Sequence, residues 1–158
     1  MNKNELYQEL YQQVDALISD EPDVIANMAN ISALLFEHLP QVNWVGFYRL
    51  IKNELVLGPF QGKVACIRIP VGTGVCGNAV SQSITLRIAD VHKFDGHIAC
   101  DATTNSEIVI PVKLNNEVIA VLDLDSTAYD HFDENDQQGL EAIINLFENI
   151  MIKHGVIN

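Results

Sequence analysis

The chain has 158 residues, which suffices for one ordinary domain but not for two. Its 48% hydrophobic content allows a sizeable core and argues against disorder. With 9 Lys and Arg against 21 Asp and Glu, the net charge of −12 disfavours binding to nucleic acid or to anionic membranes. The sequence has no apolar run as long as a membrane span and no signal peptide at its start. We therefore expect a cytoplasmic protein that forms a single domain over 1–158.

The N-terminal part predicts two helices followed by strands. Apolar residues at helical spacing predict an amphipathic helix over 4–18 and a second helix over 23–38. The apolar stripe of the first helix consists of Leu6, Leu10, Val14 and Leu17. The runs that follow are rich in aromatic and β-branched residues and predict strands at 44–50, 54–57 and 64–69.

The rest of the chain predicts a short helix near Cys76, a hairpin and a last helix. Strands are predicted at 84–88, 107–112 and 118–125. Asn115-Asn116 favours a tight turn between the last two strands, and Asp133 can cap a helix that reaches Met151. This order predicts an α+β fold with a mostly antiparallel sheet of about six strands. The N- and C-terminal helices are expected to pack on one face of the sheet.

The three cysteines are the first candidates for chemistry. An odd number without a C-x-x-C pair excludes a fully paired disulfide framework and indicates neither a zinc ribbon nor a thioredoxin motif. Cys66 lies on a predicted apolar strand, where a buried and inert thiol is the simplest interpretation. Cys100 lies in the long polar stretch 90–105, which has no clear period. An exposed thiol there is prone to oxidation, so a functional role is as well favoured as a structural one.

Carboxylates form a second candidate site. Asp123 and Asp125 are two residues apart in a predicted strand, so they share one face, and Glu107 begins the neighbouring strand. Like charges this close destabilise a sheet unless a cation or a proton lies between them. The trio predicts a site for an ammonium group, a metal ion or a group that takes a proton. The alternative is a strand end that faces solvent. Trp44 and Tyr48 are core aromatics or one wall of a small-ligand site.

Two further patterns carry less information. His92, His97 and Cys100 are metal-ligand types, but their spacing matches no known metal motif. The glycines of 72–77 fit the pattern G-x-G-x-x-G, but the order of elements around them is not that of a nucleotide-binding unit. We therefore predict neither a metal nor a nucleotide site from them.

Five segments together resemble one enzyme family. They are 58–66 (GPFQGKVAC), 72–77 (GTGVCG), 95–101 (DGHIACD), 106–111 (SEIVIP) and 121–127 (VLDLDST). In this order, over about 3–150, the chain resembles the free methionine-(R)-sulfoxide reductases, a family of stand-alone GAF domains with enzymatic activity. The segment 95–101 resembles this family specifically and not GAF domains in general.

The resemblance implies a reaction and the residues that perform it. Such enzymes reduce the R sulfoxide of free methionine without a metal or organic cofactor, and thioredoxin supplies the electrons. By motif, Cys100 matches the nucleophile, Cys66 the resolving cysteine and Cys76 an additional cysteine that could act as a secondary partner. The residues that match the family's substrate-binding positions are Trp44, Tyr48, Glu107, Asp123 and Asp125.

The implied mechanism is chemically sound. A thiolate must attack the sulfoxide sulfur while a proton reaches the departing oxygen. A carboxyl kept protonated by a neighbouring carboxylate can supply that proton, and a second carboxylate can pair with the substrate ammonium. Acidic neighbours such as Asp101 oppose thiolate formation at Cys100. A helix N-terminus, His97 or the substrate ammonium would have to offset them.

Two other interpretations compete with the enzyme. A GAF domain that senses a small molecule without catalysis would not need its thiols, and a structural or interaction protein would carry them incidentally. The apolar faces of the terminal helices are compatible with a homodimer as well as with a monomer.

Overall fold

The computed structural model describes residues 1–98 and 100–156. Within them, six antiparallel strands form one sheet in the order β3-β2-β1-β6-β5-β4. The strands are β1 Val42–Ile51, β2 Glu54–Gly62, β3 Arg68–Pro70, β4 Leu86–Ile88, β5 Ser106–Leu114 and β6 Glu117–Ser126. The helices are α1 Lys3–Ile18, α2 Val24–His38, α3 Gly74–Gln82 and α4 Glu134–Lys153, with a 3₁₀ turn at Val91–Lys93. None of the described helices is long and apolar enough to cross a membrane.

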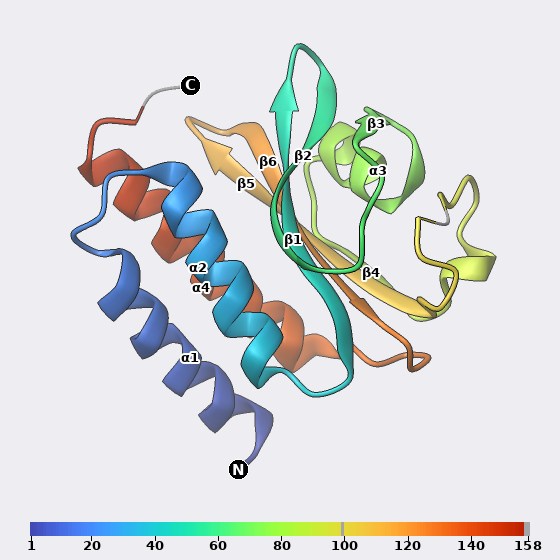
Figure 1. Cartoon of the computed structure of the whole chain (residues 1–158), viewed down its shortest axis with the longest axis horizontal. Coiled ribbons are helices and arrows are strands. Elements are labelled where there is room, and N and C mark those ends of the chain that lie inside the picture. Colours follow the sequence, from blue (N-terminus) through green and yellow to red (C-terminus); the bar gives the residue numbers. More distant parts are fainter. Residues whose placement is uncertain (99, 157–158) are drawn as a thin grey trace.

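The two faces of the sheet have different partners. Helices α1, α2 and α4 cover one face, whereas α3 and the loop after β4 lie over the other (Figure 1). Strand β6 contributes side chains to the cores on both faces of the sheet, because successive side chains of a strand point to opposite sides. Leu122 and Leu124 pack into the helix-covered core, and Val121 packs on the opposite side with Val75 of α3. The prediction of an α+β fold with the terminal helices on one face is confirmed.

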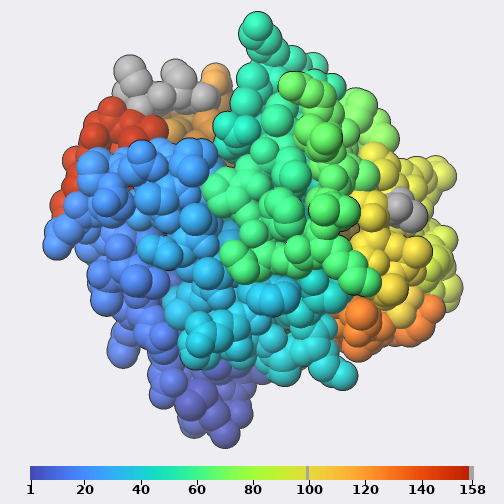
Figure 2. All heavy atoms as spheres, viewed as in Figure 1, coloured from blue at the N-terminus to red at the C-terminus, as the bar shows by residue number. Residues whose placement is uncertain are grey.

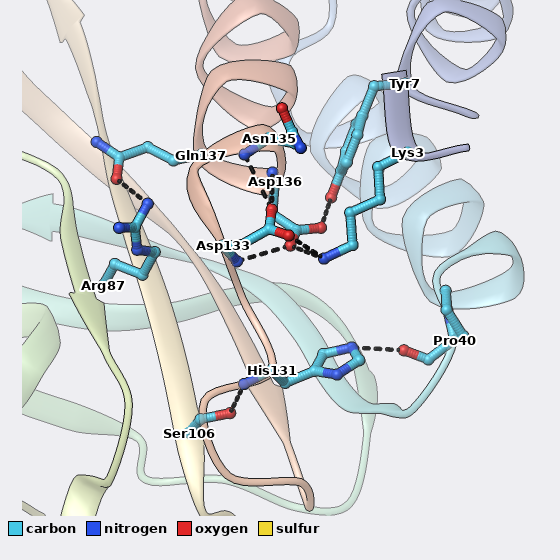
Figure 3. A network of polar contacts seen from close by, with 10 residues as sticks. All are labelled: Lys3, Tyr7, Pro40, Arg87, Ser106, His131, Asp133, Asn135, Asp136 and Gln137. Atoms are coloured by element: carbon cyan, nitrogen blue, oxygen red, sulfur yellow. Dashed lines mark hydrogen bonds and ion pairs between the residues drawn. The ribbon is translucent and has the colours of Figure 1, made fainter. Parts of the chain in front are cut away.

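The starts of α1 and α4 are joined by a polar network (Figure 3). The Asp133 side chain accepts hydrogen bonds from the backbone of the first turn of α4, as predicted for its cap, and Asp136 completes a capping box. Tyr7 of α1 donates its hydroxyl to Asp136 at 2.8 Å, and Lys3 Nζ lies 2.6 Å from the same carboxylate. The network orients the N-terminal helix against the C-terminal one.

The apolar stripes of the helices are part of this chain's own core. The buried residues of α1 are Tyr7, Leu10, Val14 and Ile18. The predicted stripe was wrong at its end, because Leu17 is exposed and Ile18 takes its place on the buried face. These stripes contact the sheet and one another and are therefore occupied within the chain, and the homodimer stays a prediction.

The predicted hairpin turn between the last two strands is confirmed, whereas one predicted strand is wrong. Asn115 and Asn116 have φ of 53° and 64°, as the predicted tight hairpin turn requires. The predicted strand 64–69 was wrong over most of its length, since only Arg68–Pro70 pairs with β2. Val64 and Ile67 are 89% and 68% exposed, so only some apolar side chains of this run pack on the protein. The carbonyl oxygen of Cys66 in this run and that of the preceding Lys63 instead accept hydrogen bonds from aromatic side chains of β1.

Candidate active site

A cavity of about 50 Å³ lies on the face of the sheet that α3 covers. Strands β1, β5 and β6 form its floor, the first turn of α3 forms one side, and two loop segments close it. The residues around it include Trp44, Tyr48, Ala65, Thr73, Gly74, Cys76, His97, Cys100, Asp101, Thr104, Glu107, Asp123 and Asp125. Of the site residues that the resemblance names, all but Cys66 line this cavity, and Cys66 is joined by a disulfide to Cys100, which does. His92, from the histidine pattern, does not line it.

Glu107, Asp123 and Asp125 meet on the floor because of strand register. Glu107 of β5 is paired with Asp125 of β6, and Asp123 follows two residues earlier on the same face. Asp123 and Glu107 are only 5% and 7% exposed, so the alternative of a strand end facing solvent is wrong. One buried oxygen each of Asp123 and Asp125 has no hydrogen-bond partner among the described residues. The floor therefore offers free acceptors to a ligand.

Asp123 and Asp125 hold their protons more tightly than ordinary carboxyl groups do. Burial raises the pKa of Asp123 well above its ordinary value, and the charges of Asp125 and Glu107 raise it further. Burial also raises the pKa of Asp125, again with a contribution from Glu107. The raised pKa values of Asp123 and Asp125 favour retention of a proton on the cavity floor, where it could be passed to a ligand.

Trp44 and Tyr48 form an aromatic wall on β1 and also hold the adjoining loop. Their rings stack with centroids 5.9 Å apart, and Trp44 is the cross-strand neighbour of Asp125. Trp44 Nε1 donates to the carbonyl oxygen of Lys63 at 3.1 Å, and the Tyr48 hydroxyl donates to that of Cys66 at 2.9 Å. Sequence reasoning left open whether these aromatics belong to the core or form such a wall. It missed the two hydrogen bonds, because nothing in the sequence links β1 to the segment 63–66.

Cys66 and Cys100 form a disulfide with a Cα–Cα distance of 5.6 Å across 34 residues of sequence. On the surface, the segment that carries Cys66 (green) lies against the loop that carries Cys100 (yellow; Figure 2). The interpretation of Cys66 as a buried strand thiol was wrong: it is half-buried in a loop. Cys100 is exposed in its polar loop, as the sequence indicated. Of the pair, Cys100 lines the cavity and Cys66 does not.

Cys76 is a different kind of thiol. It is buried in the first turn of α3, and no disulfide involves it. Burial raises its pKa well above the ordinary value, with further increases from the charges of Asp123, Glu107 and Asp125. Since the thiolate is the reactive form, Cys76 is a poor nucleophile at neutral pH.

The loop that carries Cys100 is tied to the start of β1. Asn43 Nδ2 donates to Asp101 and to Thr104 Oγ1, each at 3.2 Å. Asp101 also accepts bonds from the backbone N–H and hydroxyl of Thr103, and these bonds lower its pKa. Sequence reasoning missed Asn43, because one asparagine before a strand carries no distinguishing pattern.

The two histidines of this region have separate environments. His97 lines the cavity, and its buried Nδ1 has no hydrogen-bond partner among the described residues. His92 is exposed and pairs with Asp90 at 2.9 Å. His92, His97 and Cys100 therefore do not form a common metal site. The first turn of α3 also lines the cavity, so the partial positive charge of a helix N-terminus lies beside the acidic floor.

Comparison with known proteins agrees with this site. The GAF domain model matches residues 21–151. The chain is 53% identical over 151 residues to the free methionine-R-sulfoxide reductase of Escherichia coli (strain K12), covering 96% of this chain and 92% of that protein. The reduced form of fRMsr from Staphylococcus aureus superposes with a TM-score of 0.90 at 53% identity, over 92% and 94% of the two chains. The Neisseria meningitidis free methionine-R-sulfoxide reductase, in complex with its substrate, superposes with a TM-score of 0.94 at 40% identity, over 98% and 93%. The chain therefore belongs to the free methionine-R-sulfoxide reductases, a family of oxidoreductases built on the GAF domain.

Proposed function

We propose that this chain reduces free methionine-R-sulfoxide to methionine by thiol chemistry in the cavity. The observation that carries the proposal is the pairing of Cys66 with Cys100 at a cavity floored by buried carboxylates. A relative that is 53% identical bears the name of this activity, which supports the assignment of the substrate.

The reaction starts with the Cys100 thiolate attacking the sulfoxide sulfur. A proton passes to the sulfoxide oxygen, the oxygen moves to Cys100 as a sulfenic acid, and methionine leaves. The thiol of Cys66 then attacks the sulfenic sulfur, which forms the disulfide and releases water. A dithiol returns both cysteines to thiols and becomes a disulfide itself. We assign this last step to thioredoxin, which can reach the exposed Cys100.

The three carboxyl groups of the floor have two roles, which are to donate a proton and to bind the substrate ammonium. The raised pKa values of Asp123 and Asp125 favour one of them as the proton donor to the departing oxygen. The remaining negative charge, shared with Glu107, pairs with the ammonium of the free amino acid. A methionine inside a protein lacks this ammonium and would leave buried acceptors unpaired, so it is refused.

The remaining residues shape the site. Trp44 and Tyr48 provide the apolar wall against which the substrate side chain packs. We assign Cys76 the role of a secondary thiol, because burial and acidic neighbours disfavour its thiolate. The cycle alternates thiols with a disulfide and needs no metal or organic cofactor. It requires a reducing compartment, which is why we place it in the cytoplasm.

An assay with both free sulfoxide epimers tests the proposal. With thioredoxin, the wild-type chain should turn over the R epimer and leave the S epimer nearly untouched. Cys100→Ser should abolish methionine formation. Cys66→Ser should release about one methionine per chain and then stop, because the sulfenic acid is not resolved.

Three other outcomes would each contradict a specific part of the proposed mechanism. Retained activity in Cys100→Ser would refute Cys100 as the nucleophile. Repeated turnover of Cys66→Ser with thioredoxin at the wild-type rate would assign resolution to Cys76. Tight binding of a small ligand that needs none of the thiols, without turnover, would favour a sensing module.

A further inference from the structure

The cavity floor combines a thiol with carboxylates at the spacing of metal ligands. One ligand atom each from Cys76, Glu107 and Asp123 can be chosen so that all three lie within 4.8 Å of one another. All three residues are buried, although they come from a helix and two strands. A second observation that points to a ligand is the state of Asp123 Oδ1. It is buried, lines the cavity and has no hydrogen-bond partner among the described residues.

The electrostatics of the cavity favour a cation. Of the described residues that line it, none is Lys or Arg, whereas Asp101, Glu107, Asp123 and Asp125 are all acidic. Buried like charges repel strongly unless a proton or a cation lies between them. A small divalent ion at this point would neutralise two carboxylates and fill the free acceptor of Asp123.

The donor types select the class of ion. Zinc binds cysteine sulfur at about 2.3 Å and carboxylate oxygen at about 2.0–2.2 Å, so its ligands stand roughly 3.5 Å apart. The three ligand atoms lie within 4.8 Å of one another and would have to approach one another to reach that geometry. A thiolate ligand favours zinc and the chemically similar cadmium over magnesium and calcium, which prefer oxygen.

We propose that Cys76, Glu107 and Asp123 form a site for a zinc-type divalent cation that excludes the substrate and reversibly inhibits the chain. Binding forms a metal–sulfur bond and releases the thiol proton of Cys76 to solvent. The ion occupies the carboxylates to which the substrate ammonium is assigned, so ion and substrate compete. The ion is an inhibitor and not a cofactor. Inhibition rests on the proposed function, whereas binding does not.

The oxidised chain allows a clean test, because Cys76 is then its one free thiol. The sequence has three cysteines, and the disulfide uses two of them. Cadmium chloride should be titrated into protein with the disulfide intact, without substrate or thioredoxin, while calorimetry and cadmium–thiolate ultraviolet absorption are recorded. We expect one ion per chain together with that absorption.

Three variants separate this site from others. Cys76→Ser should lose the absorption and weaken binding at least tenfold. Glu107→Gln should weaken binding at least threefold but keep the absorption, which guards against misfolding of the cysteine variant. His92→Ala is the matched control, since this exposed histidine lies outside the cavity, and it should bind as the wild type does. Absence of the absorption in the wild-type chain, or equal affinity in Cys76→Ser, would overturn the proposal.

Inhibition is measured separately, by methionine release in a single turnover of reduced, desalted protein with zinc present. Cys76→Ser should need at least tenfold more zinc for the same slowing. Equal inhibition in both proteins would assign the effect to Cys66 and Cys100 and overturn the inhibitory role of the site. Cadmium binding by a chain that shows no turnover without metal would refute the proposed function and leave the metal site standing.

Discussion

The Tyr48 hydroxyl donates a hydrogen bond of 2.9 Å to the carbonyl oxygen of Cys66. Tyr48 belongs to the central strand β1, whereas Cys66 lies in a loop outside the sheet. Trp44, also on β1, makes the equivalent bond to Lys63 of the same loop. The sheet thus positions a loop that has little packing of its own, and with it one half of the disulfide.

Replacing Tyr48 with Phe tests this tether, since the ring stays and only the hydroxyl is lost. A hydrogen bond of this kind contributes about 1 kcal/mol, so we expect disulfide formation to slow roughly fivefold. Methionine release in a single turnover should change less, because Cys100 performs it. Rapid-quench trapping of free thiols measures the first step, and methionine release measures the second.

Tyr7→Phe is the matched control for this change. This variant also loses one hydrogen bond of a buried tyrosine hydroxyl, which Tyr7 donates to Asp136 at 2.8 Å, but on the helix-covered side of the sheet. It should lower the free energy of unfolding and leave disulfide formation at the wild-type rate. Equal slowing in both variants would mean that general loosening, and not the tether, is responsible.

Asn43→Ala should loosen the loop that carries Cys100. The variant loses the bonds to Asp101 and Thr104, so amide hydrogen exchange should become faster over 100–104. Turnover should fall a few-fold, since the nucleophile is less well positioned. Asn27→Ala, which loses a bond to the Glu21 carbonyl oxygen, is the control and should leave exchange in this loop unchanged. Unaltered exchange in Asn43→Ala would contradict the tether.

Asp123→Asn should change how stability depends on pH. The pKa of Asp123 is raised by burial, so the folded chain keeps a proton that the unfolded chain releases above about pH 4. As pH rises from 4 towards the folded pKa, this carboxyl makes the wild-type chain progressively less stable. The asparagine variant lacks this loss, so its stability relative to wild type should increase from pH 4 to pH 8 in urea unfolding.

Asp101→Asn provides a control of opposite sign. Its pKa is lowered by hydrogen bonds from Thr103, so the charged form stabilises the folded chain above the ordinary carboxyl pKa and is lost as pH falls. Because this stabilisation is gained as pH rises towards the ordinary carboxyl pKa, the variant should lose stability relative to wild type between about pH 2 and pH 4 and change little from pH 4 to pH 8. A parallel response of the two variants would refute the assigned shifts.

Gly46→Ala should disturb the aromatic wall. A Cβ at this position of β1 would lie 2.7 Å from the Trp44 ring and would also meet the Phe60 side chain. Overpacking of this kind costs about 1–3 kcal/mol. Because Trp44 is the one tryptophan of the chain, its fluorescence emission should shift as the ring moves.

The control for this overpacking lies on the helix side of the sheet. Gly139→Ala would place a Cβ against the Tyr7 ring between α1 and α4, and the emission of Trp44 should stay the same. A wild-type emission spectrum in Gly46→Ala would contradict the close contact.

Local features of the sequence determined most elements of the fold. Helical periodicity predicted α1, α2 and α4 to within one or two residues, and the capping of α4 by Asp133 needed only the chemistry of one side chain. The alternation in β6 placed Asp123 and Asp125 on one face, because successive side chains of a strand point to opposite sides. Motif resemblance then named the cysteines and the substrate.

Only the tertiary structure decided which of these residues are in contact with one another. Cys66 and Cys100 lie 34 residues apart in loops without periodicity, and side-chain bonds from Tyr48 and Asn43 of β1 hold both loops in place. Such contacts join distant segments through single polar groups, which leave no repeating pattern in the sequence. The burial that raises the pKa of Asp123 likewise depends on α3 and the loops packing over the sheet. It is a property of the folded chain alone.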